Sequence, residues 1–181
     1  METDMKSTKE VVSNALQATE KASVRNAAIV VEPSPTADTR TADHVVSLDE
    51  LRKSTEMHIM DVKRGMFYLA SLLREAGERH DWTKLRYLPS FYSQFNEAQK
   101  TGLWGNGWYD RIHVKRERHH LEDGGPEDVN LIDVLEHIVD CVMAGKARKG
   151  EYRPDVLGAG ILERAYANTQ KMMSDAVRVE K

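Results

Sequence analysis

Apolar residues recur at steps of three and four along one long segment of the chain, and this spacing constrains the fold more than any other feature. The segment follows Ser47-Leu-Asp-Glu50, where Ser47 and Glu50 have the spacing of a capping box. The stripe predicts a long amphipathic helix with His58 directed into the core and Gly77 as its left-handed stop. It comprises Leu51, Thr55, His58, Val62, Gly65, Leu69 and Leu72.

Further helical patterns follow, and no part of the chain shows the alternation that is typical of a strand. Pro89 suits the first turn of a helix, and another helix is expected from Trp108 to about His120. Asn130 is expected to cap a helix that Gly150 ends, and the last helix covers about residues 156–177. The buried residues on these helices are expected to be Phe91, Tyr92 and Phe95, then Leu131, Leu135, Ile138 and Val142, and finally Leu157, Ile161, Ala165, Met172 and Ala176. The sequence therefore predicts an all-α domain.

The folded domain is expected over residues 47–181, because residues 1–46 differ from it in composition. That first stretch holds no aromatic residue and contains Pro33 and Pro35, so it can bury little apolar surface against its ordering entropy. We interpret it as a flexible N-terminal arm. The chain of 181 residues has the length of about one domain plus a tail.

Composition excludes several classes of protein. A net charge of -3 provides no global basic field for a nucleic-acid polymer. Cys141 is the only cysteine, so an intrachain disulfide framework is excluded, and its apolar helical neighbours favour a buried, inert thiol. No apolar run approaches the ~20 residues of a membrane span, and the first residues lack a secretory pattern. We expect a cytoplasmic protein that makes no membrane contact.

Histidine and acidic residues concentrate in one part of the chain and suggest a metal site. His80 and Asp81 are adjacent, and five further histidines lie with several carboxylates between residues 58 and 140. Imidazole nitrogen and carboxylate oxygen together suit Zn, Mn, Fe or Co better than Ca or Mg. A row of histidines with adjacent carboxylates also suits acid–base chemistry.

The order His58, then His80-Asp81, then a late helical Asp resembles the H…HD…D signature of HD-domain metalloenzymes. It is similar in particular to a family of small bacterial and phage proteins known as DUF5662. The motifs that carry the resemblance lie within about residues 56–173 and include His80-Asp-Trp-Thr-Lys84, His113, His119-His-Leu-Glu122 and Leu135-Glu-His-Ile-Val-Asp140. The resemblance implies an HD-like helical bundle with a divalent transition metal (Zn, Mn, Co or Fe) at its centre. The implied metal ligands are His58, His80, Asp81 and Asp140, and Asp133 is the rival for the last place.

Three further histidines, His113, His119 and His120, have two interpretations. The superfamily includes two-metal members, so the three histidines could hold a second metal. Alternatively, His113 and His120 act as proton donors or phosphate contacts beside a single metal. Adjacent residues on a helix point about 100° apart, so His119 and His120 reach one metal only if the helix has ended. Glu122 and Glu136 are candidate acceptors that fix the tautomer of a ligand histidine. Glu122 is a candidate general base, with plain solvent exposure in a loop as its alternative.

A basic group lies close to these histidines in the sequence and suggests a phosphate contact. Lys84 follows Asp81 by three residues, so its ammonium group can stay near a metal while it pairs with a phosphate oxygen. The other candidate substrate-binding residues are Arg111, Lys115 and Arg116. A solvated helix face is the alternative interpretation of these three.

Three functions fit these observations. The first is a metal-dependent phosphohydrolase that acts on a nucleotide or a related small phosphate ester, with Lys84, His113, His120 and Glu122 as catalytic residues. The second is a di-iron oxygenase, because the superfamily that the chain resembles includes such enzymes. The third is a non-enzymatic helical interaction protein whose metal is structural. Each of the three functions is compatible with a homo-oligomer.

Overall fold

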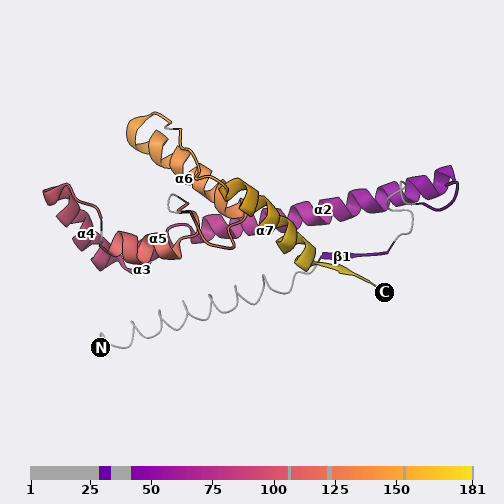
Figure 1. The fold of residues 1–181 in the computed structure, drawn as a ribbon, viewed down its shortest axis with the longest axis horizontal. Coiled ribbons are helices and arrows are strands. Elements are labelled where there is room, and N and C mark those ends of the chain that lie inside the picture. Colours follow the sequence, from indigo (N-terminus) through magenta and orange to yellow (C-terminus); the bar gives the residue numbers. More distant parts are fainter. Residues whose placement is uncertain (1–28, 34–41, 106, 122–123, 153, 181) are drawn as a thin grey trace, which may run out of the picture. The chain divides into compact units, whose positions relative to one another are not determined.

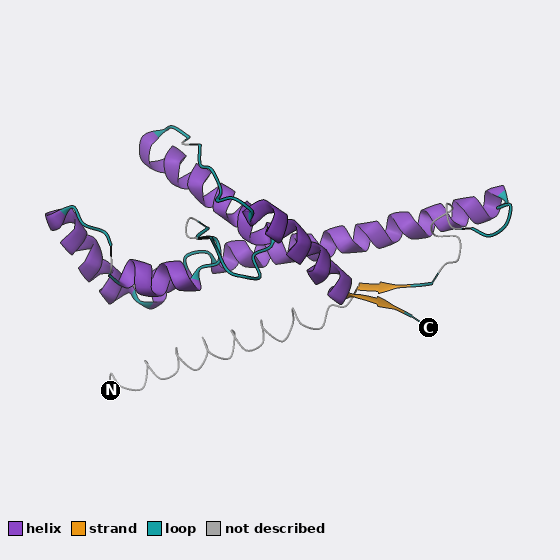
Figure 2. Cartoon of the chain, in the orientation of Figure 1, coloured by secondary structure: helices purple, strands orange, loops and turns teal. Residues whose placement is uncertain are grey.

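Helices dominate the protein, as its secondary structure in Figure 2 shows. The structure is a computed structural model that describes residues 29–33, 42–105, 107–121, 124–152 and 154–180. The predicted helical class is confirmed. No helix within these ranges combines the length and the apolar character that a membrane crossing needs. The chain divides into two compact units: Met1–Tyr68 with Met173–Lys181, and Leu69–Met172.

The first unit contains the start of the longest helix, α2, which spans Leu48–Arg79. The predicted capping box at its start is confirmed. The backbone N–H of Ser47 donates to Glu50 Oε2 at 2.8 Å, and the N–H of Glu50 donates to Ser47 Oγ at 3.3 Å. The hydrogen bond from the Ser47 backbone lowers the pKa of Glu50. Two free amides at the start of α2 are thereby satisfied by side chains close in sequence.

The first unit also contains two short strands that the sequence did not predict. Strand β1 (Ile29–Val31) pairs in parallel with β2 (Val177–Val179), as Figure 1 shows near the C-terminus. Ile29 is buried there, and Arg64 donates to the carbonyl oxygen of Val30 at 3.3 Å. Part of the stretch that we interpreted as an arm therefore pairs with the C-terminal strand. Residues 1–28 and 34–41 of that stretch lie outside the described residues.

Two expectations for α2 are wrong. His58, Leu51 and Val62 are exposed rather than directed into a core. Gly77 does not end the helix, since α2 continues to Arg79 and the left-handed backbone conformation falls on a different residue, Asp81. The 3–4 spacing correctly predicts a helix, but spacing alone does not say how much of the stripe finds a packing partner.

The second unit holds the remainder of α2 and the other helices up to Met172 of α7. Its elements are α3 (Trp82–Arg86), α4 (Leu88–Thr101), the π-helical turn η2 (Tyr109–His113), α5 (Val114–Arg116), α6 (Leu131–Lys149) and α7 (Ile161–Ala176). Its buried apolar cluster joins the loop before α6 to α6 and α7 and consists of Leu121, Val129, Val134, Ile161 and Ala165. A hydrogen bond also joins α6 to α7: the backbone N–H of Leu131 donates to Thr169 Oγ1 at 2.9 Å.

The ends of α6 follow the prediction, but its buried face does not. Asn130 caps the helix in a capping box with Asp133, and Gly150 ends it in the left-handed conformation. The predicted core residues Leu135 and Ile138 are 43% and 48% exposed. The buried positions are instead Ile132, Asp133, Val134 and His137. The inward side of α6 therefore combines apolar residues with the polar residues Asp133 and His137.

The other helices also differ from the prediction in part. Tyr92 of α4 is exposed, and Phe95 is 43% exposed. The helix expected from Trp108 to His120 ends at Arg116. The last helix begins at Ile161, directly after Gly160 with its positive φ of 78°, rather than near residue 156. Glycine favours this backbone conformation because it has no Cβ, so Gly160 delays the start of α7.

Candidate metal centre

The centre begins where α2 ends. Asp81 has φ 58° and occupies the N-cap position of α3, yet its side chain caps no backbone amide. A left-handed non-glycine residue is uncommon, and Asp is among the residue types that tolerate it. The carboxylate points to other side chains: Asp81 Oδ2 accepts from Lys84 Nζ at 2.5 Å, and Asp81 Oδ1 lies 3.4 Å from His113 Nε2. The carboxylate of Asp81 therefore does not cap α3 and lies beside Lys84 and His113 instead.

His113 is buried, and a chain of hydrogen bonds fixes its proton. The hydroxyl of Thr83 donates to Glu117 Oε1 at 2.6 Å, so Thr83 Oγ1 can only accept from His113 Nδ1, which lies 2.7 Å away. His113 therefore carries its proton on Nδ1 and presents the bare lone pair of Nε2 to the centre. A ligand histidine held in this way by outer hydrogen bonds is typical of metal sites.

The surroundings of His113 keep its ring neutral. Burial, and after it the positive charge of Lys84, lowers the pKa of His113 to about 3. The ring of Trp108 stacks on it with centroids 5.6 Å apart. His113 is the last residue of the π-helical turn η2, a type of distortion that is frequent at functional sites. Metal binding requires a neutral imidazole, and His113 is held in that form.

Residues 117–120 form a turn after α5, and three contacts fasten this turn to neighbouring elements. The backbone N–H of Thr83 donates to Glu117 at 2.9 Å. Arg118 donates to both carboxylate oxygens of Asp133 at 2.8 Å. His137 Nδ1 of α6 donates to the carbonyl oxygen of His119 at 2.8 Å. The turn is therefore held on the start of α6, with His119 and the next residue directed to the centre.

His119 lies at the middle of the cluster and is 1% exposed. Both of its ring nitrogens and Asp81 Oδ1 are buried without a hydrogen-bond partner. His119 Nδ1 lies 3.1 Å from Glu136 Oε1, although the two atoms are not aligned for a hydrogen bond. Buried polar atoms without partners are costly. A cation bound between the bare nitrogen of a neutral His119 ring and Asp81 Oδ1 would provide a partner for both of these lone-pair atoms.

His120 joins the cluster through His113. Their Nε2 atoms lie 2.9 Å apart, and His113 already has its proton on Nδ1. Two bare lone pairs repel each other at this distance. The contact therefore requires a proton on His120 Nε2 or a cation shared by the two rings.

The opposite side of the centre is formed by His80 and α6. His80 Nδ1 lies 3.0 Å from Glu136 Oε1, which leaves His80 Nε2 facing Asp140 Oδ1 at 3.4 Å. Glu136 thus occupies the position expected of an acceptor that orients a ligand histidine. Asp133 is already engaged by Arg118 and by the cap of α6. Asp140, rather than Asp133, lies with the histidines.

The charges at the centre are strongly coupled. Burial alone would raise the pKa of Asp81 and of Glu136, but Lys84 beside Asp81, and His119 and His80 beside Glu136, hold each pKa below its ordinary value. Burial alone would lower the pKa of His119, but Glu136, and then Asp140 and Asp81, raise it. Acids with lowered pKa around a histidine with raised pKa indicate a site that favours positive charge.

Two overlapping groups in this region have the spacing of metal ligands. One consists of Asp81, His113, His119 and His120, and the other of His80, His119 and Asp140; the ligand atoms within each group lie within 4.8 Å of one another. We call these six residues the central cluster. Their nitrogen and oxygen donors fit a divalent transition metal. The predicted residues His80, Asp81, Asp140, His113, His119 and His120 are thus brought together.

Other predicted site residues lie elsewhere. His58 is exposed in the first unit, and none of the groups with metal-ligand spacing among the described residues includes it. Arg111, Lys115 and Arg116 are exposed, and Arg116 donates to the hydroxyl of Tyr87 at 2.8 Å. Glu122 lies outside the described residues. The sequence interpretation also missed Thr83 and Glu117. Their spacing was the available signal: Thr83 follows Asp81 by two residues, and Glu117 follows His113 by four.

The fold and the cluster together describe a mostly helical protein with buried His/Asp groups that could hold a metal ion. Comparisons of the chain with protein-family models, with curated proteins and with solved structures find no match.

Proposed function

We propose that the chain is a metal-dependent phosphohydrolase that acts on a nucleotide or a related small phosphate ester. The observation that carries the proposal is the carboxylate of Asp81. It sits at an N-cap without capping, has one buried oxygen without a hydrogen-bond partner, and contacts Lys84 at 2.5 Å. An acid and an ammonium group beside the same cluster of histidines suit a metal and a phosphate bound next to each other.

The proposed ligands come from the central cluster. His113 and His80 are oriented by Thr83 and Glu136, so each offers Nε2 to the centre. Asp81, Asp140 and His119 would complete the site. A divalent transition metal bound there would supply Lewis-acid activation of the phosphoryl group and a nucleophilic water at neutral pH.

The remaining chemistry belongs to the side chains. Lys84 would shift from Asp81 toward a phosphoryl oxygen and neutralise negative charge that develops in the transition state. His120 is less buried than His113 and would transfer a proton to the leaving oxygen while its neighbour remains a ligand. Exposed Arg111 and Lys115 would attract the phosphorylated substrate from solution.

A di-iron oxygenase is the second candidate, and one observation favours it. The two ligand groups share His119 and together offer six side chains, enough donors for two ions. Such an enzyme would contain two irons per chain and consume oxygen, whereas a structural metal would give neither phosphate release nor oxygen uptake.

The test uses the full-length protein loaded with Mn, Co, Zn or Fe and a panel of nucleotides, with phosphate release as the readout. Lys84→Met should reduce turnover by roughly 10²–10³ while metal content is unchanged, because one electrostatic donor is lost. Lys100→Met is the matched control, since Lys100 is an exposed lysine in the last turn of α4. It should behave as the parent protein.

Two results would contradict the proposal. One is the absence of phosphate release from every nucleotide with every metal in the panel. The other is equal turnover in Lys84→Met and Lys100→Met. Oxygen uptake by the iron-loaded protein, together with two irons per chain, would then support the oxygenase instead.

A further inference from the structure

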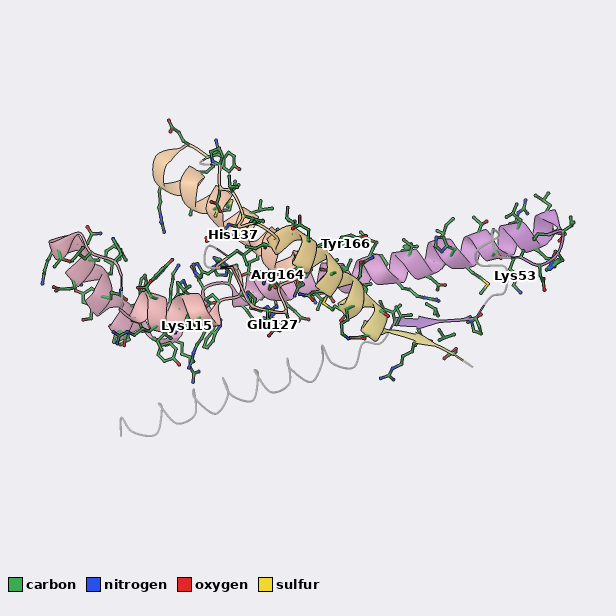
Figure 3. All side chains as sticks on the ribbon, in the orientation of Figure 1. Lys53, Lys115, Glu127, His137, Arg164 and Tyr166 are labelled. Carbon is green, nitrogen blue, oxygen red and sulfur yellow. The ribbon has the colours of Figure 1, made fainter. Side chains whose placement is uncertain are left out.

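A second group of potential ligands lies on α6, apart from the central cluster. It consists of His137, Cys141 and Asp155, and we call it the cysteine cluster. His137 and Cys141 are four residues apart on one helix, so their side chains share a face. Asp155 reaches them from the segment between α6 and α7. Figure 3 labels His137, the buried member of the cluster.

The proton of His137 is fixed by the backbone. His137 Nδ1 lies 2.8 Å from the carbonyl oxygen of His119, and a carbonyl can only accept. Nδ1 therefore carries a proton, and Nε2 of the neutral ring has a bare lone pair. That lone pair faces Asp155 Oδ2 at 2.7 Å and Cys141 Sγ at 3.7 Å. The arrangement requires a positive charge at Nε2, either a proton or a metal ion.

The contacts exclude a catalytic triad. In a nucleophile–His–acid arrangement the acid binds one ring nitrogen and the nucleophile binds the other. Here Asp155 and Cys141 both approach Nε2, while Nδ1 is occupied by the backbone of His119. His137 consequently cannot relay a proton between the two. Three donors that converge on one point are typical of a metal site.

The distances fit zinc in particular. Zn–S and Zn–N bonds of about 2.3 Å and about 2.0 Å place sulfur and nitrogen about 3.5 Å apart around a tetrahedral ion. Cys141 Sγ and His137 Nε2 are 3.7 Å apart. Asp155 would have to withdraw by about half an ångström to reach the oxygen position of that geometry, and it is exposed. Thiolate, imidazole and carboxylate form a ligand set that favours Zn²⁺ over Mg²⁺ or Ca²⁺.

We infer that the cysteine cluster binds a Zn²⁺-class ion through Cys141 Sγ, His137 Nε2 and a carboxylate oxygen of Asp155. The ion fastens the segment after α6 to the helix. Because His137 also holds the backbone of His119, the same ion stiffens the turn at residues 117–120. This site is separate from the central cluster and has a structural role.

The test exploits the single cysteine of the chain. Full-length protein is titrated with Co²⁺, and the absorption of thiolate-to-cobalt charge transfer is followed in the near ultraviolet. That absorption can come only from Cys141, so it reports this site even when the central cluster also binds cobalt. The expected result is a charge-transfer band that reaches saturation as Co²⁺ is added and is lost on addition of excess Zn²⁺.

Variants assign the other ligands. Cys141→Ser should abolish the band, and His137→Asn and Asp155→Asn should each weaken cobalt binding by at least about tenfold. Asn at position 137 can still donate to the carbonyl of His119, which keeps the turn in place. Glu151→Gln removes an exposed acid from the same segment and should leave the band unchanged. Asp140→Asn should leave it unchanged as well, which separates this site from the central cluster.

Two results would overturn the inference. The first is cobalt binding without any thiolate band at saturation. The second is a band that survives His137→Asn and Asp155→Asn at the parent affinity. Circular dichroism and the thermal midpoint of each variant show whether it has folded, and protection of the thiol from alkylation by Zn²⁺ provides a second readout that does not use cobalt.

Discussion

Replacing Thr83 with valine tests the hydrogen-bond chain that orients His113. Valine has nearly the shape of threonine but cannot accept from His113 Nδ1 or donate to Glu117. Thr83 and His113 are both fully buried, and Glu117 is 5% exposed, so water cannot replace the lost partners. An unsatisfied buried donor costs about 1–3 kcal/mol, and a lost hydrogen bond to a charged acceptor about 1.5–3 kcal/mol. Together they lower the free energy of unfolding by about 3–5 kcal/mol.

Thr83→Ser is the conservative comparison. Serine keeps the hydroxyl and loses one buried methyl group, which costs about 1 kcal/mol. Thr101→Val is the matched control, because the Thr101 hydroxyl is exposed: it donates to the carbonyl oxygen of Glu97 at 2.9 Å and accepts from the N–H of Leu103 at 3.3 Å, where water can replace it. Its effect should remain within about 0.5 kcal/mol.

The assay has two arms. Urea unfolding of the metal-free protein gives the stability, and competition with a chromophoric chelator gives the metal affinity. Thr83→Val should be less stable than Thr83→Ser by about 2–4 kcal/mol. Its metal affinity should be reduced about 10–100-fold, since the outer hydrogen bond that orients His113 is gone. Equal stability and equal affinity in the two variants would refute the proposed orientation of His113.

Three further predictions concern the centre and its supports. Asp81→Asn should lose metal while the thermal midpoint changes by no more than a few degrees, because Asn tolerates the left-handed conformation at φ 58°. Elemental analysis measures the metal content and a thermal melt measures the midpoint. Retained metal would rule out Asp81 as a ligand. Lowering the pH should weaken metal binding, because the carboxylates of Glu136, Asp140 and Asp81 raise the pKa of His119 despite its burial. At and below that raised pKa a proton competes with the metal, and chelator competition from about pH 8 to about pH 5 should show affinity falling with pH; a flat profile would contradict this role of His119. Asn130→Ala should lower the free energy of unfolding by about 0.5–2 kcal/mol because α6 loses its cap; urea unfolding measures it, and an unchanged midpoint would show that the cap is dispensable.

The sequence by itself determined the helical class and the caps at several helix ends. Ser47 with Glu50 forms the predicted capping box, Asn130 caps α6 as predicted, and Gly150 ends α6 as expected. These features depend on hydrogen bonds between residues a few positions apart, so a short stretch of sequence contains all the atoms involved. The adjacency of His80 and Asp81 likewise indicated part of the site without any knowledge of packing.

Packing decided which helix faces turn inward. On α6, apolar residues at 3–4 spacing predicted a buried stripe through Leu135 and Ile138, yet His137 is buried and those two are exposed. Neighbouring stripes on one helix can both satisfy the spacing, and the choice between them rests on residues far away in the sequence. The pairing of Ile29 with Val177 also joins residues far apart in the sequence, and each strand is too short to show a pattern of its own.

Tertiary structure also decided that His119 and His120 meet at one centre. On a continuous helix these neighbours would point about 100° apart. The chain instead leaves the helix at Arg116, and contacts from Thr83, Asp133 and His137 hold the turn that follows. Those contacts join residues that are distant in sequence, and their hydrogen bonds form only when α3, the turn and α6 are already packed. The residue types of the site could therefore be recognised from the sequence, whereas their convergence depends on the folded chain.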